Sequence, residues 1–409
     1  MIACCFYMIE NFGGFMMTLD KSRWTDYQAL YLHVPFCRQK CLYCDFASYA
    51  GYSEEIMERY TQAVCREIAA RREEARQMSS AATIYFGGGT PSVLPGACLE
   101  QLVAALRQYG FWQQPQEATI EVNPGTANLD KLRLLRQLGF DRISFGVQSL
   151  NDDELRTIGR IHNGRQALEA VAWARQAGFE RISCDLIYGL PGQTLASLRA
   201  NLRGLTELGI EHLSVYGLIV EEGTPLAGLV AQGRLLLPDE DLCADMYELV
   251  QQYLQQQGFE RYEVSNYAKN GQYSRHNLAY WRYHPYIAFG AAACGFDGKV
   301  RRTAAENVEA YVDGVLQNAQ ADKLYNTERL TAAEMLGEFM FMGLRCVQGA
   351  DLAEAQARFG VDVMARFGQE LKTFLEQDWL RLEKGGRYLR LTQQGMAVGN
   401  RIFEIFVTA

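Results

Sequence analysis

The 409-residue sequence lacks any apolar run near the roughly eighteen residues that a transmembrane helix needs, which argues against a membrane anchor. Residues 1–16 lack the positive n-region and the small-residue cleavage site of a signal peptide. Basic residues are not in excess: the formal net charge is −8, which argues against a general binder of nucleic acid or anionic membranes. Because residues 1–24 show no packing pattern, we predict an unstructured N-terminal extension, with translation starting at Met16 or Met17 as an alternative.

The cysteines lack the arrangements of two common structural sites. Their total of eleven is odd and their spacing is irregular, which argues against a disulfide framework and favours a reducing, cytoplasmic location. The chain has no second C-x₂-C pair, whereas closed zinc sites need four ligands and usually arise from two separated pairs. A zinc site would have to recruit a fourth ligand, such as His33 or a distant cysteine.

The sequence does contain one compact cysteine triplet. Cys37, Cys41 and Cys44 have the spacing C-x₃-C-x₂-C and follow a short strand-like run. Three thiolates on one tight loop can hold three irons of a [4Fe–4S] cube, whereas an ordinary electron-transfer cluster is held by four cysteines. The triplet therefore predicts a cluster with one iron left open for chemistry.

Six short β-rich runs lie between Gln28 and about Leu218, separated by stretches of helical character. The runs are residues 30–34, 83–86, 119–122, 142–147, 181–187 and 212–218. Strands that alternate with helices favour a parallel sheet with right-handed crossovers, and a closed barrel would need eight units. The sequence therefore predicts an α/β fold with a partial (βα)₆ barrel.

A degenerate repeat supports this count of units. Gly139, Gly178 and Gly209 each stand between a helical stretch and a strand, in the related segments LGFDRIS, AGFERIS and LGIEHLS. Glycine suits the left-handed cap after a helix, where a side chain would be strained. We expect three successive αβ units at these positions.

Polar and glycine-rich motifs follow the predicted strands. In chain order they are the cysteine loop, GGGTP at 87–91, EVNPG at 121–125, Gln148-Ser149, Asp185 with GLPGQT at 189–194, and Glu221-Glu222. The carboxyl ends of parallel barrel strands share one rim, where such folds keep their active sites. The motifs are therefore expected to lie together.

We divide the chain into four parts. After the extension 1–24, residues 25–237 form the partial barrel, 238–325 form an extension containing HNLAYW, and 326–409 form a mainly helical C-terminal domain. In this last part residues 380–391 alternate around a Gly-Gly turn, which predicts a winged-helix-like β-hairpin followed by a last helix. Winged helices often bind DNA, but equal numbers of basic and acidic residues from Cys346 onward favour a scaffold or docking role.

Several rim residues have side chains suited to a zwitterionic ligand. Gly87, Gly88 and Gly89 would let the backbone approach an ammonium group, although the same glycines also suit a tight turn. The fork of donors on Arg160 could grip a carboxylate. Glu121, Gln148 and Asp185 offer acceptors for hydroxyl or ammonium groups, but each type is also common as a cap or surface residue.

These motifs resemble those of the radical S-adenosylmethionine (SAM) superfamily, in the group around oxygen-independent coproporphyrinogen III oxidase. Within that group CDF at 44–46 and HNLAYW at 276–281 resemble the HemW heme chaperones. The resemblance implies that Cys37, Cys41 and Cys44 bind the [4Fe–4S] cluster. It further implies that the SAM contacts are Tyr31, Tyr43, Gly88, Gly89, Thr90, Glu121, Gln148, Arg160 and Asp185.

The resemblance also implies heme binding around HNLAYW. His276 is a plausible iron ligand, and Tyr280 and Trp281 could stack on a flat macrocycle. The alternative is a hydrogen-bonded core cluster of the histidine with its aromatic neighbours. Cys294 stands where these proteins usually have histidine, so it is either a substitute ligand or an inert buried thiol.

The sequence thus predicts a heme chaperone that binds heme, a [4Fe–4S] cluster and SAM and transfers heme to acceptors such as respiratory proteins. An electron donor such as a flavodoxin or ferredoxin is expected, as is peripheral contact with the membrane during heme delivery. The enzymatic alternative is a coproporphyrinogen III oxidase-type oxidoreductase. Against it, the chain has Phe46 where the oxidase has a further cysteine, and a shorter N-terminal extension. A radical methyltransferase is a third alternative, for which the sequence reveals no methyl acceptor.

Overall fold

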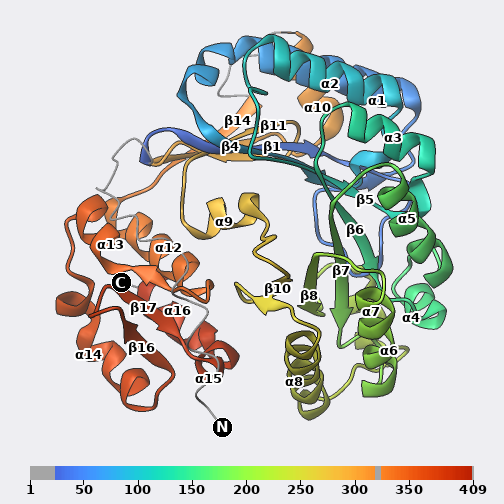
Figure 1. The fold of residues 1–409 in the computed structure, drawn as a ribbon. Helices are drawn as coiled ribbons and strands as arrows, with labels where there is room; N and C mark the ends of the chain where they lie inside the picture. The colour runs from blue at the N-terminus through green and yellow to red at the C-terminus, as the bar shows by residue number, and fades with distance from the viewer. Residues whose placement is uncertain (1–23, 318–323, 408–409) are drawn as a thin grey trace.

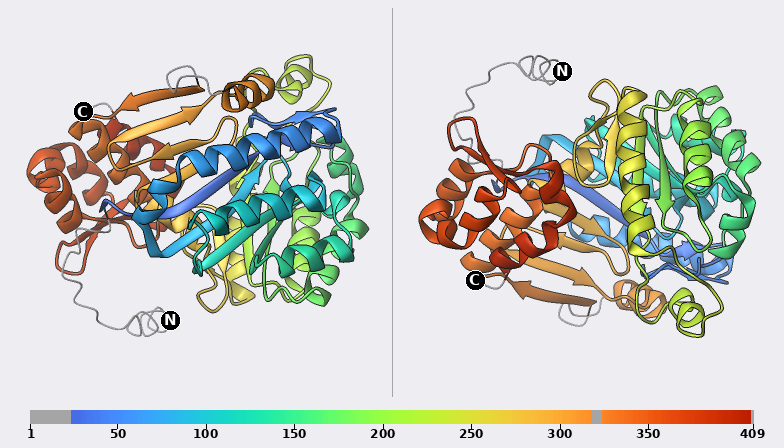
Figure 2. Two further views of the ribbon diagram at one scale, coloured as in Figure 1. Left: turned by 90° about the horizontal axis from the view of Figure 1, so that it is seen from above. Right: turned by 90° about the horizontal axis from the view of Figure 1, so that it is seen from below.

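The structure, a computed structural model, describes residues 24–317 and 324–407. The predicted extension 1–24 lies outside the described residues except for Trp24. A twelve-stranded sheet with the order β14-β13-β12-β11-β1-β4-β5-β6-β7-β8-β10-β9 dominates the fold (Figure 1). A smaller C-terminal domain lies beside the β11–β14 end of this sheet (Figure 2).

Six parallel strands in the middle of the sheet confirm the predicted αβ units. They are β1 (Tyr27–Val34), β4 (Met78–Gly88), β5 (Glu117–Val122), β6 (Arg142–Gln148), β7 (Arg181–Tyr188) and β8 (His212–Gly217). Each pairs in parallel with the next strand of this series. The curved, incomplete barrel predicted from the sequence is therefore confirmed.

Helices between these strands cover the convex face of the sheet (Figures 1 and 2). They are α1 (Glu54–Ala70), α2 (Gly96–Gln108), α3 (Leu129–Gln137), α4 (Asp152–Thr157), α5 (Gly164–Gln176) and α6 (Leu195–Thr206), and α7 (Pro225–Ala231) and α8 (Glu240–Gln256) follow β8. On α1 the residues Tyr60, Val64 and Ile68 share one face at helical spacing and are buried. The repeat glycines Gly139 and Gly178 have φ of 100° and 91°, as a left-handed helix cap requires.

Side chains alternate between the two faces of the central strands, because successive residues of a strand point to opposite sides. One set is apolar and joins the core beneath the helices, for example Leu30 and Leu32 on β1 and Ile143 and Phe145 on β6. The other set faces the concave side and is largely polar. It includes Tyr31, Tyr85, Glu121, Ser144, Asp185 and Ser214.

The segment after residue 237 extends both edges of the same sheet. Its elements are β9 (Glu260–Arg261), β10 (Asn266–Ala268), α9 (Arg275–Trp281), β11 (Tyr286–Phe289), β12 (Cys294–Phe296), β13 (Val300–Ala304), α10 (Val308–Leu316) and β14 (Tyr325–Arg329). Strand β10 pairs antiparallel with β8, and β11 pairs parallel with β1. The sequence analysis did not predict these strands, and its domain boundaries remain a prediction.

The carboxylate of Glu67 on α1 fastens part of this segment to the barrel. It accepts hydrogen bonds from the Tyr311 hydroxyl at 2.5 Å, the Tyr325 hydroxyl at 2.6 Å and the Gly290 amide at 3.0 Å. Arg71 forms a 3.0 Å ion pair with it. A buried carboxylate with four donors is well compensated, so α10, β14 and the end of β11 are held against α1.

The C-terminal domain is built around a second apolar core, which Tyr283 and Phe296 of the preceding segment join. It comprises α12 (Ala332–Leu344), β15 (Ala350–Asp351), α13 (Leu352–Phe359), α14 (Val363–Glu376), β16 (Leu380–Glu383), β17 (Tyr388–Leu391), α15 (Gln393–Ala397) and α16 (Gly399–Val407). The predicted hairpin is β16–β17, and β15 completes a three-stranded antiparallel sheet. The mainly helical domain with a small β-sheet is therefore confirmed.

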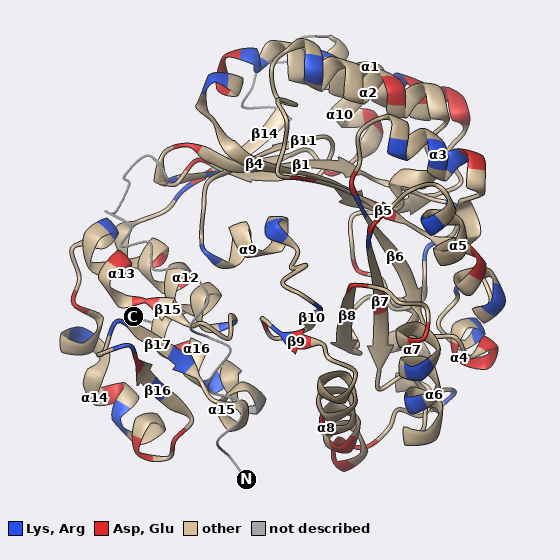
Figure 3. Cartoon of the chain, in the orientation of Figure 1, with Lys and Arg blue, Asp and Glu red and all other residues tan. Residues whose placement is uncertain are grey.

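Charged residues of both signs are interspersed over the outer helices (Figure 3). Across the two described ranges we find no helix that is both long enough and apolar enough to cross a membrane.

Candidate functional site: the cysteine loop and the concave face

The cysteine loop is fixed at the end of β1 by the backbone. Short strands β2 (Phe36–Cys37) and β3 (Tyr49–Ala50) pair with each other and close the loop. The Leu42 amide donates to the Ile158 carbonyl at 3.0 Å, and the Leu42 carbonyl accepts from the Leu226 amide at 2.9 Å. The loop is thus anchored to the ends of α4 and α7, at the predicted rim.

Each cysteine of the triplet has a polar neighbour at its sulfur. The Cys37 Sγ lies 3.5 Å from the Thr90 hydroxyl, and the Cys44 Sγ lies 3.7 Å from the Ser48 hydroxyl. Arg160 Nη1 donates to the Cys41 Sγ at 3.2 Å. Burial raises the pKa of the Cys37 thiol, and hydrogen bonds from Thr90 and Ser48 oppose that rise. Donors at the sulfurs stabilise thiolates, the form that binds metal.

The three thiols also fit a cube better than a single ion. All three are free and partly exposed. Among the described residues, no group of three or more His, Cys, Asp or Glu side chains converges on one metal position. A cube does not require such convergence, because each thiolate binds a different iron. When bound, a cluster of this kind supplies an electron that can break the sulfonium C–S bond of SAM.

The glycines after β4 are required by close packing. Gly88 has φ of 110°, and a Cβ at this position would lie 2.5 Å from the His33 ring. A Cβ at Gly89 would lie 2.7 Å from the Phe36 carbonyl oxygen. The Gly89 amide in turn donates to the Val34 carbonyl at 2.8 Å. Packing therefore explains both glycines whether or not a ligand is bound.

Glu121 and its neighbours form the part of the concave face next to these glycines. Its carboxylate accepts from the Tyr85 hydroxyl at 2.7 Å and from the Gly88 amide at 3.2 Å. Burial, with a smaller contribution from Asp185, raises the pKa of Glu121 to about 7. Beside it, the Tyr31 hydroxyl lies 3.0 Å from His33 Nδ1.

Gln148 and Arg160 lie next to each other across Gly146. A Cβ at Gly146 would come within 3.2 Å of Arg160 Nη2 and 3.3 Å of Gln148 Nε2, so glycine leaves room for both. Gln148 has a positive φ of 68°, which is unusual for a side chain of this type. The Gln148 Oε1 and Arg160 Nε atoms are buried, with no hydrogen-bond partner among the described residues. Unpaired buried polar atoms are costly, so they indicate a bound polar group.

Side chains that are exposed to solvent lie on the same part of the concave face. The central strands are mostly buried, but Tyr31, Tyr85, Glu121, Gln148 and Asp185 are partly exposed, and Tyr216 is 41% exposed. Solvent therefore reaches the concave face near the cysteine loop. The sequence analysis missed Tyr85 and Tyr216, although the alternation of β4 and β8 places them on this face.

The other predicted SAM contacts lie around the same rim. Asp185 accepts from the Ser144 hydroxyl at 3.3 Å, and burial raises its pKa. Thr90 contacts Cys37 as described, and its amide donates to the Phe36 carbonyl. Tyr43 packs on the apolar cluster of Ile158, Ile187 and Leu190. The structure thus brings all nine predicted SAM contacts to the rim with the three cysteines.

A buried network that the sequence did not reveal supports this rim. The Glu154 carboxylate accepts from Ser149 at 2.6 Å, from Gln193 at 3.1 Å, from Ser197 at 2.6 Å and from Asn201 at 3.1 Å. The Gln193 side chain also accepts from the Gly189 amide at 2.8 Å. The GLPGQT motif therefore fixes the loops after β6 and β7 to each other.

His276 of HNLAYW lies in a closed core arrangement at 1% exposure. Its Nδ1 lies 2.8 Å from the Thr83 hydroxyl, and its Nε2 lies 3.0 Å from the Tyr280 hydroxyl. Its ring stacks on Tyr85, with centroids 4.8 Å apart. Burial lowers the pKa of His276 to about 3. This is the hydrogen-bonded core cluster that the sequence analysis kept as an alternative, with both ring nitrogens engaged.

The remaining heme candidates lie on or beside a cavity of about 390 Å³ between α9, the β11–β13 strands and α12. Tyr280 and Trp281 line it, whereas His276 and Cys294 do not. Cys294 is free and partly exposed on β12. It lies near Tyr286: burial raises the pKa of the Tyr286 hydroxyl, and the charge of Cys294 and a hydrogen bond with it raise that pKa further.

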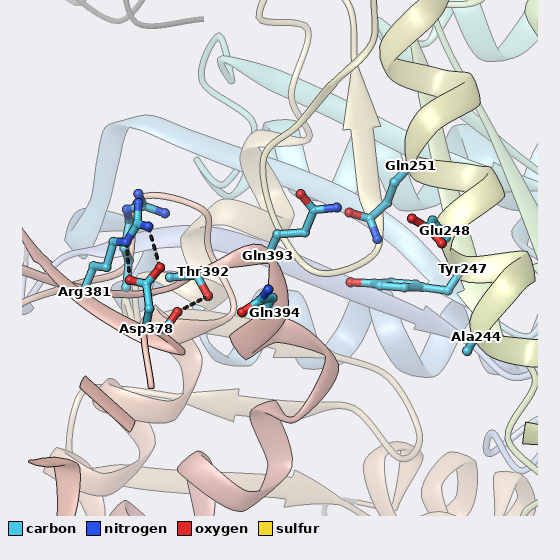
Figure 4. Close-up of a pocket in the computed structure, with 10 residues that line it drawn as sticks. Ala244, Tyr247, Glu248, Gln251, Asp378, Arg381, Thr392, Gln393 and Gln394 are labelled. Carbon is cyan, nitrogen blue, oxygen red and sulfur yellow. Dashed lines mark hydrogen bonds and ion pairs between the residues drawn. The ribbon is translucent and has the colours of Figure 1, made fainter. Parts of the chain in front are cut away.

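A second cavity, of about 660 Å³, separates α8 from the hairpin of the C-terminal domain (Figure 4). Tyr247, Glu248 and Gln251 face it from α8, and Gln393 and Gln394 face it from α15. Its charged side chains pair locally, as in the ion pair between Arg381 and Asp378 and that between Arg390 and Glu383. Most of the lining side chains carry a polar group, and none of them is a histidine, cysteine or methionine.

Comparison with known proteins places this geometry in a family. Residues 31–203 match the Radical SAM superfamily, and residues 330–398 match the HemN C-terminal domain. The sequence is 36% identical over 381 residues to the heme chaperone HemW of Bacillus subtilis, covering 93% of this chain and 99% of the relative. The chain belongs to the HemW family of radical SAM proteins.

Two further similarities extend the comparison. The heme chaperone HemW of Escherichia coli is 33% identical over 386 residues, covering 93% of this chain and 98% of that protein. The solved structure of the radical SAM enzyme coproporphyrinogen III oxidase (HemN) from Escherichia coli superimposes with a TM-score of 0.80 at 23% identity, covering 94% and 91% of the two chains. At that identity the superposition shows a shared fold.

Proposed function

We propose that this protein is a heme chaperone that binds heme, a [4Fe–4S] cluster and SAM and transfers heme to acceptor proteins, including respiratory enzymes. The observation that carries the proposal is the similarity along almost the whole chain to proteins named heme chaperone HemW. The arrangement of the cysteine loop and of the concave face supports the two cofactors. Membership of the radical SAM superfamily implies both.

Cys37, Cys41 and Cys44 would hold the cluster, and the rim would hold SAM. Arg160 lies within reach of the Cys41 sulfur and keeps Nε unpaired, so it is placed to meet a carboxylate beside the cluster. Gln148 and Glu121 offer acceptors to the same ligand. Tyr31, Tyr43, Gly88, Gly89, Thr90 and Asp185 complete the proposed SAM site.

Heme would occupy the cavity between α9 and α12. Tyr280 and Trp281 supply flat surfaces there, on which a macrocycle can stack. The HNLAYW motif would then act through its last two residues, with His276 holding Tyr280 in place. Of the predicted heme residues, Cys294 lies beside this cavity without lining it.

The competing enzymatic function is oxidation of coproporphyrinogen III. Phe46, at the position where the resemblance places a further cysteine of the oxidase, is 65% exposed next to the cluster loop. Its benzyl side chain offers neither a thiol nor a proton to a substrate above the loop. This difference favours the chaperone function over the oxidase.

One anaerobic experiment separates the two functions. Reconstituted protein is titrated with hemin and followed by its Soret band, and is then supplied with coproporphyrinogen III, SAM and a reductant such as flavodoxin or ferredoxin. We expect tight heme binding, transfer of the heme to an apo-respiratory protein and no decarboxylated product. Product formation without heme binding would reject the proposal in favour of the oxidase.

A further inference from the structure

The short helix α4 connects two residues of the proposed SAM site. Gln148 at the end of β6 precedes the helix and Arg160 follows it. Asn151 caps the helix, since its side chain accepts from two amides of the first turn. At the other end the Arg160 amide donates to the Leu155 carbonyl at 2.9 Å. The path of residues 148–160, which we call the α4 segment, therefore sets where Gln148 and Arg160 lie relative to each other.

The α4 segment also holds the cysteine loop. The Ile158 carbonyl accepts from the Leu42 amide at 3.0 Å. A Cβ at Gly159 would lie 3.0 Å from the Leu42 side chain, so the segment and the loop pack closely. Arg160 in turn donates to the Cys41 sulfur at 3.2 Å. A change in the orientation of the segment would therefore change the contact between Arg160 and the cysteine loop.

A single carboxylate attaches the α4 segment to the next αβ unit. Glu154 of α4 is 5% exposed, and both of its carboxylate oxygens accept hydrogen bonds. Oε1 accepts from Ser197 of α6 at 2.6 Å, and Oε2 accepts from Ser149 at 2.6 Å, from Gln193 at 3.1 Å and from Asn201 of α6 at 3.1 Å. A helix of this length is not stable by itself, so its position depends on contacts of this kind.

Apolar packing holds the α4 segment as well. Ile158 packs with Ile187 and Leu190, and the Leu155 side chain is 1% exposed. Apolar contacts keep the segment on the core, but they are non-directional, whereas hydrogen bonds favour one alignment of donor and acceptor. Loss of the Glu154 carboxylate should therefore leave the segment attached to the barrel and alter its orientation.

We infer that Glu154 is a positioning residue of the SAM site, which acts through the α4 segment to hold Arg160 and Gln148 in line with the cysteine loop. The inference rests on the proposed function and deepens it. Glu154 would not touch the ligand in this role, because both of its oxygens are buried against donors of the protein. Its loss should weaken SAM binding, while the three thiolates still assemble the cluster.

The test uses the full-length protein and two kinds of measurement. SAM affinity of cluster-reconstituted protein is measured by equilibrium binding, and by the electron paramagnetic resonance spectrum of the reduced cluster with and without SAM. Hydrogen exchange of the protein without cofactors follows the amides of Leu42 and Arg160, which donate to carbonyls of the α4 segment. Glu154→Ala should weaken SAM binding by about tenfold to a hundredfold, the usual cost of losing an outer partner of a ligand site. It should also speed the exchange of both amides and keep the wild-type iron content.

Two further variants separate positioning from general stability. Glu154→Gln keeps an oxygen for the three donors at Oε2, and its amide group can donate to Ser197, whose hydroxyl lies 3.0 Å from the Thr194 carbonyl as another acceptor. This variant should restore most of the affinity for SAM. Glu67→Ala is the matched control, because Glu67 is likewise a buried carboxylate with four donors but fastens α10, β14 and the end of β11. It should lose stability and keep the wild-type affinity for SAM.

The outcomes distinguish this inference from the proposed function. If wild-type protein with a full cluster binds no SAM, the proposed function fails and the inference fails with it. If wild-type protein binds SAM and Glu154→Ala binds it equally well, or Glu67→Ala loses as much affinity, the inference fails while the proposed function stands. An equal loss in Glu154→Gln would assign the effect to the charge of the carboxylate and overturn a role through its hydrogen bonds.

Milder variants keep the inference testable if Glu154→Ala does not fold. Ser149→Ala and Ser197→Ala each remove one donor to the carboxylate. Both should weaken SAM binding and speed the exchange of the Arg160 amide. Wild-type affinity and wild-type exchange in both variants would overturn the inference.

Discussion

The cysteine rim and helix α9 were both predicted as functional sites from short motifs, yet their polar atoms are arranged differently. At the rim, Gln148 Oε1 and Arg160 Nε are buried with no hydrogen-bond partner in the described part of the chain, and the three thiols are partly exposed. On α9 both ring nitrogens of His276 are already paired within the protein. The rim is incomplete without a ligand, whereas the histidine of α9 is complete without one.

This difference shows how a ligand site can be told from a structural motif: by whether its buried polar atoms already have hydrogen-bond partners within the protein. A buried polar group without a partner costs about 1–3 kcal/mol, and a ligand can remove that cost. A paired group gains nothing from a ligand unless the existing bonds break first. We therefore expect substitutions at the rim to affect cofactors, and substitutions at His276 to affect stability.

The largest expected effect is at the cluster ligands. Replacing any one of Cys37, Cys41 or Cys44 by Ala should abolish the [4Fe–4S] cluster, because each of these thiolates would hold a different iron of the cube. Iron and acid-labile sulfide analysis after anaerobic reconstitution measures this. The melting temperature of the protein without cluster should change little. Cys243→Ala, a free and partly exposed cysteine of α8, is the control and should retain wild-type iron content.

On α9 we expect the reverse result, a loss of stability with the cluster retained. His276→Ala removes the bonds to Thr83 and Tyr280 and leaves a void beside Tyr85, so it should lower the free energy of unfolding by about 2–4 kcal/mol. Denaturant unfolding measures the loss, and the iron content of the reconstituted variant should stay at the wild-type level. A fully stable His276→Ala protein would show that the hydrogen-bonded core cluster is not structural.

Most of the fold could be predicted because its signals are local. Each of the six barrel strands is a β-rich run, and the repeat glycines mark helix ends. Strands β9–β14 were missed because each has only two to five residues, too few for a clear alternating pattern. The pairing of β11 with β1 was also hidden, because it joins Tyr286 to Ala29, which is far away in the sequence. The rim followed from topology alone, since parallel strands end together. The distant partners of His276 could not be predicted, because Thr83 lies 193 positions away and Glu117 lies 159 positions away. Tyr280, four positions away, belongs to the core cluster that the sequence analysis kept as an alternative.

A smaller effect is expected where the rim should meet the carboxylate of SAM. Arg160→Lys keeps the positive charge but loses the planar fork of donors, and with it the paired contacts. We expect SAM binding to weaken by about tenfold to a hundredfold, as charge-assisted hydrogen bonds of about 1.5–3 kcal/mol imply. Equilibrium binding to the cluster-loaded protein measures this. Arg165→Lys, an exposed arginine on α5, is the matched control. Equal affinities in both variants would remove Arg160 from the site.

The smallest expected effect is the contribution of Glu121 to the change of the free energy of unfolding with pH. Burial raises its pKa to about 7, so between about pH 4.5 and 7 the folded protein binds more protons at this group than the unfolded chain. The stabilising contribution is therefore full below about pH 4.5 and is lost as the pH rises through 7. We expect the free energy of unfolding to fall by about 1–2 kcal/mol over this range, which is less than the pKa shift alone implies because the side chain is partly exposed.

Two variants test this expectation by denaturant unfolding at several pH values. In Glu121→Gln the free energy of unfolding should vary less with pH, whereas in Glu100→Gln, on the exposed face of α2, it should vary as in the wild type. If the free energy of unfolding of Glu121→Gln varied with pH as in the wild type, burial would not be raising the pKa of this carboxylate. The polar groups of the rim would then be compensated within the protein, as His276 on α9 is.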